Sequence, residues 1–221
     1  MLNVFQRASV RAGINLRYSQ GFNPRPKISL PLPRPVGIES DEEILVLPTI
    51  IHPSEIPDSR QDNFMHSFKA LSAQLPQGCE LLSMYIVRKK PSFQSCSAAY
   101  EFTIRSQYFN KKLKNMINRL TASESLIVKR PIDIKGKIDR KRPVIKKFPD
   151  QETGRSRIKE IDVKEFITSV ETKENCIIVV TKITPKGTVR IQEIMELLEL
   201  YTEKLAYPIK RTNMQWEKDK N

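Results

Sequence analysis

The chain is organised around one proline-rich stretch, Tyr18-Ser-Gln-Gly-Phe-Asn-Pro-Arg-Pro-Lys-Ile-Ser-Leu-Pro-Leu-Pro-Arg-Pro-Val-Gly37. Gly21 can adopt a positive φ that other residues resist. Pro24 and Pro26 fix their own φ and drive the residues before them toward extended conformations. The stretch is therefore predicted to be a stiff, shaped loop that leads into a short strand over residues 27–32. Such a loop loses little conformational entropy on binding, which suits a recognition surface.

Cationic and aromatic side chains gather in this loop. Aromatic rings among cations suit single-stranded nucleic acid, whose bases stack and whose phosphates attract positive charge. The candidate residues for binding nucleic acid or a partner, with two arginines of the preceding helix, are Arg7, Arg11, Tyr18, Ser19, Gln20, Gly21, Phe22, Asn23, Arg25 and Lys27. The alternative is a rigid connector whose cations are merely solvated. Phe22 is interpreted as a buried anchor of the loop rather than an open stacking platform.

The first part of the stretch resembles the Y-S-x-G-F-N-P-x-P-K-x-S core of the radical SAM-linked proteins, a bacterial family of unknown function. Weaker matches follow in the family's order. Gly37–Glu43 resembles G-V-x-S-x-x-E, Lys159–Ile167 resembles K-E-x-D-[IV]-R-P-x-[IL], Gly187–Ile194 resembles G-x-V-R-P-x-E-V, and Ile209–Asn213 resembles V-x-R-T. The resemblance implies a partner: a radical S-adenosylmethionine iron–sulfur enzyme, to which such domains are fused or beside which they are encoded.

In that family a strand and a run resembling R-F-L-S-H-L-D precede the first helix, and neither is present in this sequence. Either Met1 is a mis-assigned start or the strand belongs to a neighbouring polypeptide. A missing strand leaves an unpaired sheet edge, which is a template for pairing with another chain. The resemblance therefore predicts that the chain dimerises, aggregates or borrows a strand.

Hydrophobic periodicity predicts an α+β protein of two tandem ferredoxin-like domains, each with the order βαββαβ and the first without its leading strand. The expected domains are residues 1–90 and 95–221. The first has expected helices at 4–12 and 64–75 and strands at 27–32, 44–51 and 81–87. The second has expected strands at 100–105, 125–129, 176–183 and 208–216, with helices at 108–120 and 189–200. A set of unrelated α+β elements is the alternative.

The net charge of +13 points to an anionic partner, with nucleic acid the first candidate and an anionic membrane surface the second. A strongly basic insertion at about 130–159, broken by prolines and glycines, is predicted to be a flexible arm that neutralises phosphates without reading sequence. The arm residues are Lys135, Lys137, Arg140, Lys141, Arg142, Lys146 and Lys147. A solvated insertion is the alternative.

Arg190 stands at a predicted helix start, where Thr188 is the expected N-cap. A helix N-terminus beside an arginine suits an anion such as phosphate, so Arg190 joins the candidate binding residues. The alternative is that Arg190 pairs with Glu193 or Asp162.

Sequence motifs for chemistry are sparse. The three cysteines lack the spacing of an iron–sulfur or disulfide motif, and the two histidines fall on different elements, so we expect no cofactor and no metal in this chain. Asp41, Glu42 and Glu43 are adjacent and would point to alternating faces. No apolar run is long enough to span a membrane, and the first residues do not form a signal peptide, so a cytoplasmic protein is expected.

Three functions remain open from the sequence. The first is a non-catalytic accessory module that binds RNA and presents it to the radical enzyme. The second is a protein-interaction domain whose loop docks that enzyme, without nucleic acid. The third is a metal-independent RNA-processing enzyme that uses lysine or tyrosine.

Overall fold

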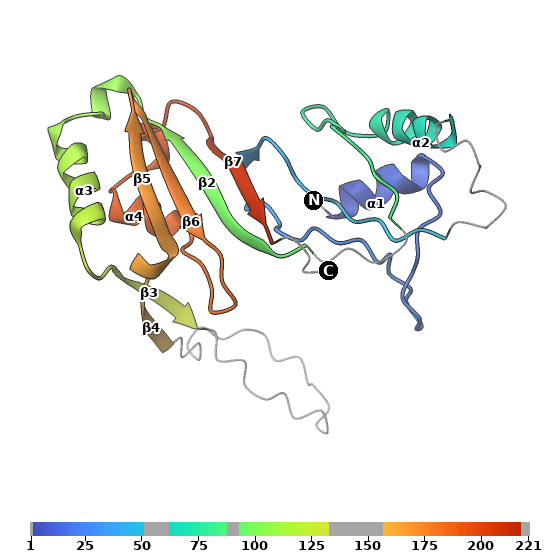
Figure 1. The fold of residues 1–221 in the computed structure, drawn as a ribbon, viewed down its shortest axis with the longest axis horizontal. Helices are drawn as coiled ribbons and strands as arrows, with labels where there is room; N and C mark the ends of the chain where they lie inside the picture. The colour runs from blue at the N-terminus through green and yellow to red at the C-terminus, as the bar shows by residue number, and fades with distance from the viewer. Residues whose placement is uncertain (1, 51–61, 88–92, 133–156, 218–221) are drawn as a thin grey trace, which may run out of the picture. The chain divides into compact units, whose positions relative to one another are not determined.

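The computed structural model describes residues 2–50, 62–87, 93–132 and 157–217. The helices in these ranges are α1 (Leu2–Arg11), α2 (Asp62–Ser72), α3 (Lys111–Ala122) and α4 (Ile191–Leu197), with single 3-10 turns η2 (Ser106–Tyr108), η3 (Lys164–Phe166) and η4 (Thr202–Lys204). The strands are β1 (Ile38–Ser40), β2 (Ser95–Thr103), β3 (Ile127–Ile132), β4 (Arg157–Asp162), β5 (Ile167–Lys173), β6 (Cys176–Lys182) and β7 (Ile209–Trp216). The expected α+β class is confirmed (Figure 1).

The described strands form a five-stranded mixed sheet in the order β1-β7-β2-β6-β5 and a separate two-stranded hairpin, β3-β4. β1 runs parallel to β7, with Ile38 opposite Ile209, whereas β5 and β6 are antiparallel. The chain divides into two compact units, Met1–Ala98 with Ile209–Asn221, and Ala99–Pro208.

The second unit has a well-filled core. α3 confirms the helix expected at 108–120, and its buried residues, Leu113, Ile117 and Leu120, lie on one face. They share the core with Phe102 and Ile177, both fully buried. Asn110 begins α3 as an N-cap, and its side-chain oxygen accepts from Leu113 N–H at 3.1 Å. Each fully buried Leu, Ile or Phe contributes roughly 1.5–3 kcal/mol, so this core is the main source of stability in the unit.

The first unit has less regular structure. α1 and α2 pack together, and Ala8 and Leu71 are the buried apolar residues of these helices. Gly13 ends α1 with φ +71°, as the sequence predicted. The predicted strands at 27–32 and 44–51 are wrong as regular elements, since the described residues there form only isolated bridges, Ser29 with Val46 and Leu16 with Thr49. Prolines lack the N–H that a ladder needs, which limits pairing along this stretch.

Four further differences separate the structure from the sequence-based elements. Residues 81–87 form no strand. The strand predicted at 125–129 exists as β3, but it pairs with β4 in the separate hairpin, with Lys129 opposite Glu160. β5, which no prediction anticipated, takes the sheet position beside β6 instead. The Gly37–Glu43 segment, where the sequence predicts no strand, contains β1.

Candidate nucleic-acid interface

The proline-rich stretch begins as a backbone hairpin, residues Arg17–Lys27. Tyr18 and Pro26 form an antiparallel bridge. Ser19 N–H donates to the Arg25 carbonyl at 2.7 Å, and Lys27 N–H donates to the Arg17 carbonyl at 2.8 Å. The Ser19 hydroxyl oxygen accepts from Arg25 N–H at 2.9 Å. Because these three bonds close both ends of the turn, the expected shaped loop is confirmed as a hairpin, and in Figure 1 it projects as a narrow blue loop after α1.

The base of the Arg17–Lys27 hairpin is fixed to a second chain segment. Arg17 N–H donates to the Pro48 carbonyl at 2.8 Å, and Ile50 N–H donates to the Asn15 carbonyl at 2.9 Å. Leu16, between these two contacts, is 4% exposed and anchors the base in the core. The hairpin is thus held where it leaves the unit, while its tip faces solvent.

The tip exposes an aromatic ring. Gly21 has φ +146°, which confirms its predicted positive φ, and a Cβ built there would meet nothing within 4 Å. Phe22 is fully exposed at 107% of its reference area, and Tyr18 is 43% exposed. The interpretation of Phe22 as a buried anchor is therefore wrong. The turn is closed by backbone bonds and the Ser19 hydroxyl, so the hairpin needs no apolar anchor at its tip.

The cations of the hairpin are exposed as well. Arg25 and Lys27 point to solvent, and among the described residues their side chains make no hydrogen bond or ion pair. Gln20 and Asn23, the remaining polar residues of the tip, are also exposed. The structure thus brings together on one short hairpin the candidate residues from Tyr18 to Lys27.

Other candidate residues lie elsewhere. Arg7 and Arg11 are exposed on α1, and among the described residues no polar contact joins them to the Arg17–Lys27 hairpin. The arm residues Lys135, Lys137, Arg140, Lys141, Arg142, Lys146 and Lys147 lie outside the described residues. Their role stays a prediction, and the described chain shows only that β3 and β4 flank the segment.

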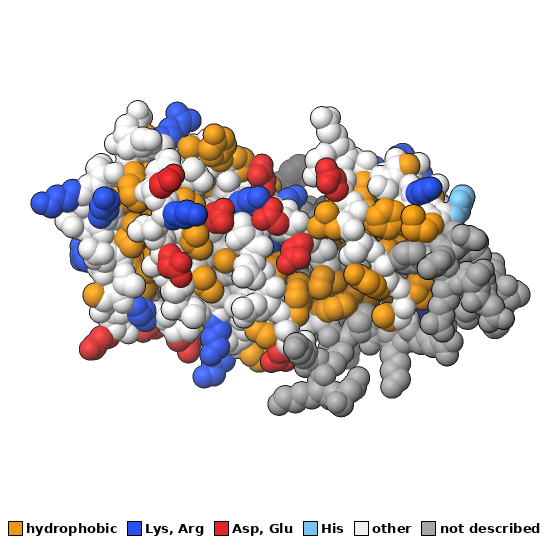
Figure 2. Space-filling model, turned by 45° about the horizontal axis from the view of Figure 1, so that its top comes forward, with side chains coloured by type: hydrophobic (Ala, Val, Ile, Leu, Met, Phe, Trp, Pro, Cys, Tyr) orange, Lys and Arg blue, Asp and Glu red, His pale blue; other side chains and the backbone are white. Residues whose placement is uncertain are grey.

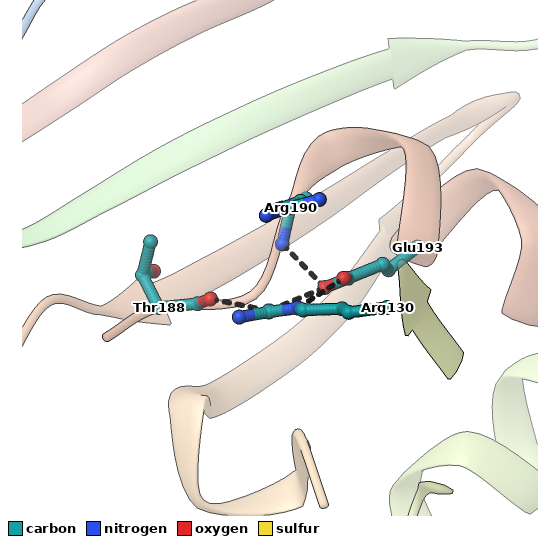
Figure 3. A network of polar contacts seen from close by, with 4 residues as sticks. All are labelled: Arg130, Thr188, Arg190 and Glu193. Atoms are coloured by element: carbon teal, nitrogen blue, oxygen red, sulfur yellow. Dashed lines mark hydrogen bonds and ion pairs between the residues drawn. The ribbon is translucent and has the colours of Figure 1, made fainter. Parts of the chain in front are cut away.

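Arg190 begins α4, as Figure 3 shows, and its backbone N–H donates to Glu193 Oε2 at 2.8 Å. Thr188 is therefore not the N-cap: its hydroxyl donates to the Lys182 carbonyl, at 3.0 Å. The Arg190 side chain is exposed. Because a carboxylate of this chain already accepts from the helix-start N–H, the geometry gives no separate support to an anion there, and the binding role of Arg190 stays a prediction.

Glu193 is the centre of a buried polar network that the sequence did not reveal. Arg130 donates to both of its carboxylate oxygens, from Nε at 2.5 Å and Nη2 at 2.8 Å, and Nη2 also donates to the Thr188 carbonyl at 2.8 Å. The side chains of Arg130 and Glu193 are 14% and 8% exposed. Burial opposes ionisation of Glu193, but the hydrogen bonds from Arg130 and Arg190 outweigh it and lower its pKa.

Two residues of the acidic run at 41–43 form ion pairs with residues of β7. Glu43 accepts from Arg211 of β7, which is 1% exposed and also donates to the Leu32 carbonyl at 3.0 Å. Asp41 pairs with Lys210 at 2.6 Å. The expectation that adjacent carboxylates diverge is consistent with these separate partners. Within the described ranges, no group of three His, Cys, Asp or Glu side chains could hold a metal ion.

Asp162, a residue of the K-E-x-D match, caps a turn. Its Oδ1 accepts from the N–H groups of Leu126 and Lys164, both at 2.9 Å. These bonds, that of Leu126 first, lower the pKa of Asp162. The residue therefore joins the start of β3 to the end of β4, and its described contacts do not include Arg190.

A family model described as "Uncharacterized protein conserved in bacteria (DUF2344)" matches residues 1–196 of the chain. No curated protein and no solved structure matches. The expected likeness to a bacterial family of unknown function is thereby confirmed, whereas the link to radical enzymes stays a prediction. Every helix in the described part of the chain is too short or too polar to serve as a membrane span.

Proposed function

The chain belongs to the DUF2344 family of uncharacterized proteins conserved in bacteria, and on this premise we propose that it is a non-catalytic accessory module that binds RNA through the Arg17–Lys27 hairpin. The observation that carries the proposal is the full exposure of Phe22 on a hairpin whose cations have no polar partner among the described residues. Exposed aromatics beside cations are what single-stranded nucleic acid needs, since the ring stacks on a base while the cations meet phosphates.

The contrast with other charged residues supports this choice. Glu193, Glu43 and Asp162 each accept hydrogen bonds from groups of the same chain, as described above. The side chains of Phe22, Arg25 and Lys27 make no such contacts within the described residues, although the hairpin beneath them is well ordered by backbone bonds. A hairpin whose exposed side chains make no contacts with the described residues is better suited to binding a ligand than to stabilising the fold.

The proposal extends to a partner. The match of the same hairpin to the radical SAM-linked core supports a radical S-adenosylmethionine enzyme as the protein that acts on the bound RNA. The exposed Phe22 would serve equally as an anchor for that enzyme, because aromatic side chains dominate protein interfaces. Docking without nucleic acid is therefore the second candidate function, and the experiment below separates the two. RNA processing by the chain itself receives no support from the described side chains.

The finer fold is also a proposal. We propose that residues 95–216 form a ferredoxin-like domain in which β2, β5, β6 and β7 are the four strands and β3-β4 is an insertion. The order β7-β2-β6-β5 places the last strand beside the first and the third between first and second, as a split β-α-β unit requires. The second copy expected over residues 1–90 has no support in the described residues, because the segments 27–32, 44–50 and 81–87 form no regular strand. The expected domain boundaries, residues 1–90 and 95–221, depend on the same ferredoxin-like interpretation.

The test is a titration of labelled single-stranded RNA followed by fluorescence anisotropy over a salt series. Phe22→Ala should weaken binding roughly tenfold, as expected for one lost stacking contact. Arg25→Ala with Lys27→Ala should lower the slope of log affinity against log salt by about 1.4, since each phosphate contact on a single strand contributes about 0.7. Melting temperature should hardly change in either variant, because all three side chains are exposed.

Matched controls come from exposed residues of the other unit, Tyr207→Ala for the ring and Lys173→Ala with Lys182→Ala for the charges. If the controls weaken RNA binding as much as the hairpin variants, the binding is nonspecific and the proposed site is wrong. If the protein does not bind single-stranded RNA at all, the second candidate function, docking of a protein partner, is favoured instead.

A further inference from the structure

The two units differ in how completely they bury their apolar residues. Among the described residues of the first unit, the buried apolar side chains are Ala8, Leu16, Ile38, Leu71, Ala98, Ile209 and Met214. The described residues of the second unit contain about three times as many. Most of the exposed large hydrophobic side chains lie in the first unit. Figure 2 shows apolar side chains gathered on one visible face of the molecule. Large exposed apolar patches usually mark interaction surfaces.

The clearest part of this surface is Leu81–Val87, which follows α2 and carries no charge. Leu82 and Ile86 are each 65% exposed, Tyr85 is 82% exposed and Val87 is 58% exposed. Among the described residues, no backbone hydrogen bond involves any residue of the segment. Figure 1 draws it as an open green trace without a strand arrow. Its composition nevertheless predicts a strand, although within the described ranges its backbone groups have no hydrogen-bond partner.

We propose that Leu81–Val87 pairs with the same segment of a second copy of this chain, antiparallel and about a two-fold axis. A segment with unpaired backbone donors and acceptors is completed by another strand. Folded proteins seldom present such a free strand, but every copy of this chain presents the same one. One pairing event therefore completes two segments, as in a closed symmetric dimer.

The charge pattern fits a second copy. Centred on Met84, antiparallel self-pairing places Leu82 opposite Ile86 and Leu81 opposite Val87. The segment is uncharged, so the pairing brings no like charges face to face. The first unit holds 15 Lys/Arg and 10 Asp/Glu, a net charge of +5, whereas the second unit holds 23 and 15, a net charge of +8. Self-association through the first unit therefore meets less electrostatic repulsion than association through the second.

The test uses the predicted opposition of Leu82 and Ile86, both exposed and therefore replaceable without loss of the fold. Molecular mass is measured by sedimentation equilibrium and light scattering over a wide range of protein concentration. Leu82→Lys with Ile86→Lys puts lysines opposite each other and should abolish the dimer. Leu82→Lys with Ile86→Glu puts opposite charges there and should dimerise roughly tenfold more tightly than the double lysine variant.

Tyr207→Lys with Tyr201→Lys, at exposed positions of the other unit, controls for added charge and should leave the dimer unchanged. A monomer at every concentration in the unmodified protein overturns the proposal. A dimer that persists in the double lysine variant also overturns it. The same holds if the control variant weakens the dimer as much as the double lysine variant does, or if both charge arrangements at 82 and 86 weaken it equally. These outcomes do not involve RNA, so they are independent of the function proposed for the hairpin.

Discussion

Arg130 of β3 and Glu193 of α4 are paired through two hydrogen bonds across 63 positions of sequence, with little exposure of either side chain. The pair fixes β3 against the start of α4, because Glu193 also accepts from Arg190 N–H. It stands just before the segment 133–156, so it anchors the place where the basic insertion leaves the fold.

Arg130→Ala is expected to destabilise the protein by about 3 kcal/mol, because it leaves the Glu193 carboxylate buried without its cation. Urea unfolding followed by circular dichroism gives the change in unfolding free energy. Lys129→Ala is the control: its 3.9 Å pair with Glu160 lies on the surface, with side chains 70% and 64% exposed. That variant should change stability by less than about 0.5 kcal/mol. Equal losses in the two variants would contradict the assigned role of Arg130.

Stability should fall as the pH is lowered through the acid range, in part because of Glu193. Its pKa is lower in the folded protein than in the unfolded chain. The unfolded state therefore takes up the proton first as the pH falls. The stabilisation is present above the ordinary carboxyl pKa of about 4.3 and is lost below it, through the folded value. Urea unfolding of the wild type and Glu193→Gln between neutral pH and this range should show a smaller pH slope in the variant. Parallel curves would show that another group is responsible.

Gly21→Val should strain the Arg17–Lys27 hairpin by about 1–3 kcal/mol, because residues with a β-carbon rarely adopt φ +146°. There is free space around the site, so the cost comes from the backbone alone. A lower melting temperature and weaker RNA binding are both expected. Gln20→Val, next to it in the chain and also exposed, is the matched control and should affect neither. An unaltered melting temperature in Gly21→Val would mean that the turn accepts other conformations.

Deletion of Gly136–Gly154 should reduce nonspecific RNA affinity and its salt dependence, because the segment holds six Lys or Arg residues against three Asp or Glu. The fold should survive, since Arg130 and Glu193, which lie outside the deletion, hold β3 in place. Anisotropy and thermal melting are measured together. Replacement of Lys and Arg in the segment by Gln, at unchanged length, separates charge from chain length. Loss of the folded state on deletion would contradict a purely peripheral arm.

The sequence alone determined the elements whose signals are local. The spacing of Leu113, Ile117 and Leu120 predicts the inward face of α3, and the β-branched run from Cys176 predicts β6. The positive φ of Gly21 could be predicted from its residue type, because glycine has no β-carbon that would clash in this conformation. Each of these depends on neighbours within a few residues, so the pattern of residues is sufficient to predict them.

Only the tertiary structure decided which distant groups meet and which side chains remain in solvent. The pairing of β3 with β4, the sheet position of β5, and the contacts of Glu193 with Arg130 and of Glu43 with Arg211 join residues far apart in the chain. Phe22 is an apolar residue of the kind that usually lies in a core. Backbone hydrogen bonds close the turn of its hairpin without any contact from the Phe22 ring, so the ring stays exposed. Local periodicity indicates which face of a helix or strand is apolar. Which element packs against that face, and which side chains stay exposed, depends on the rest of the chain.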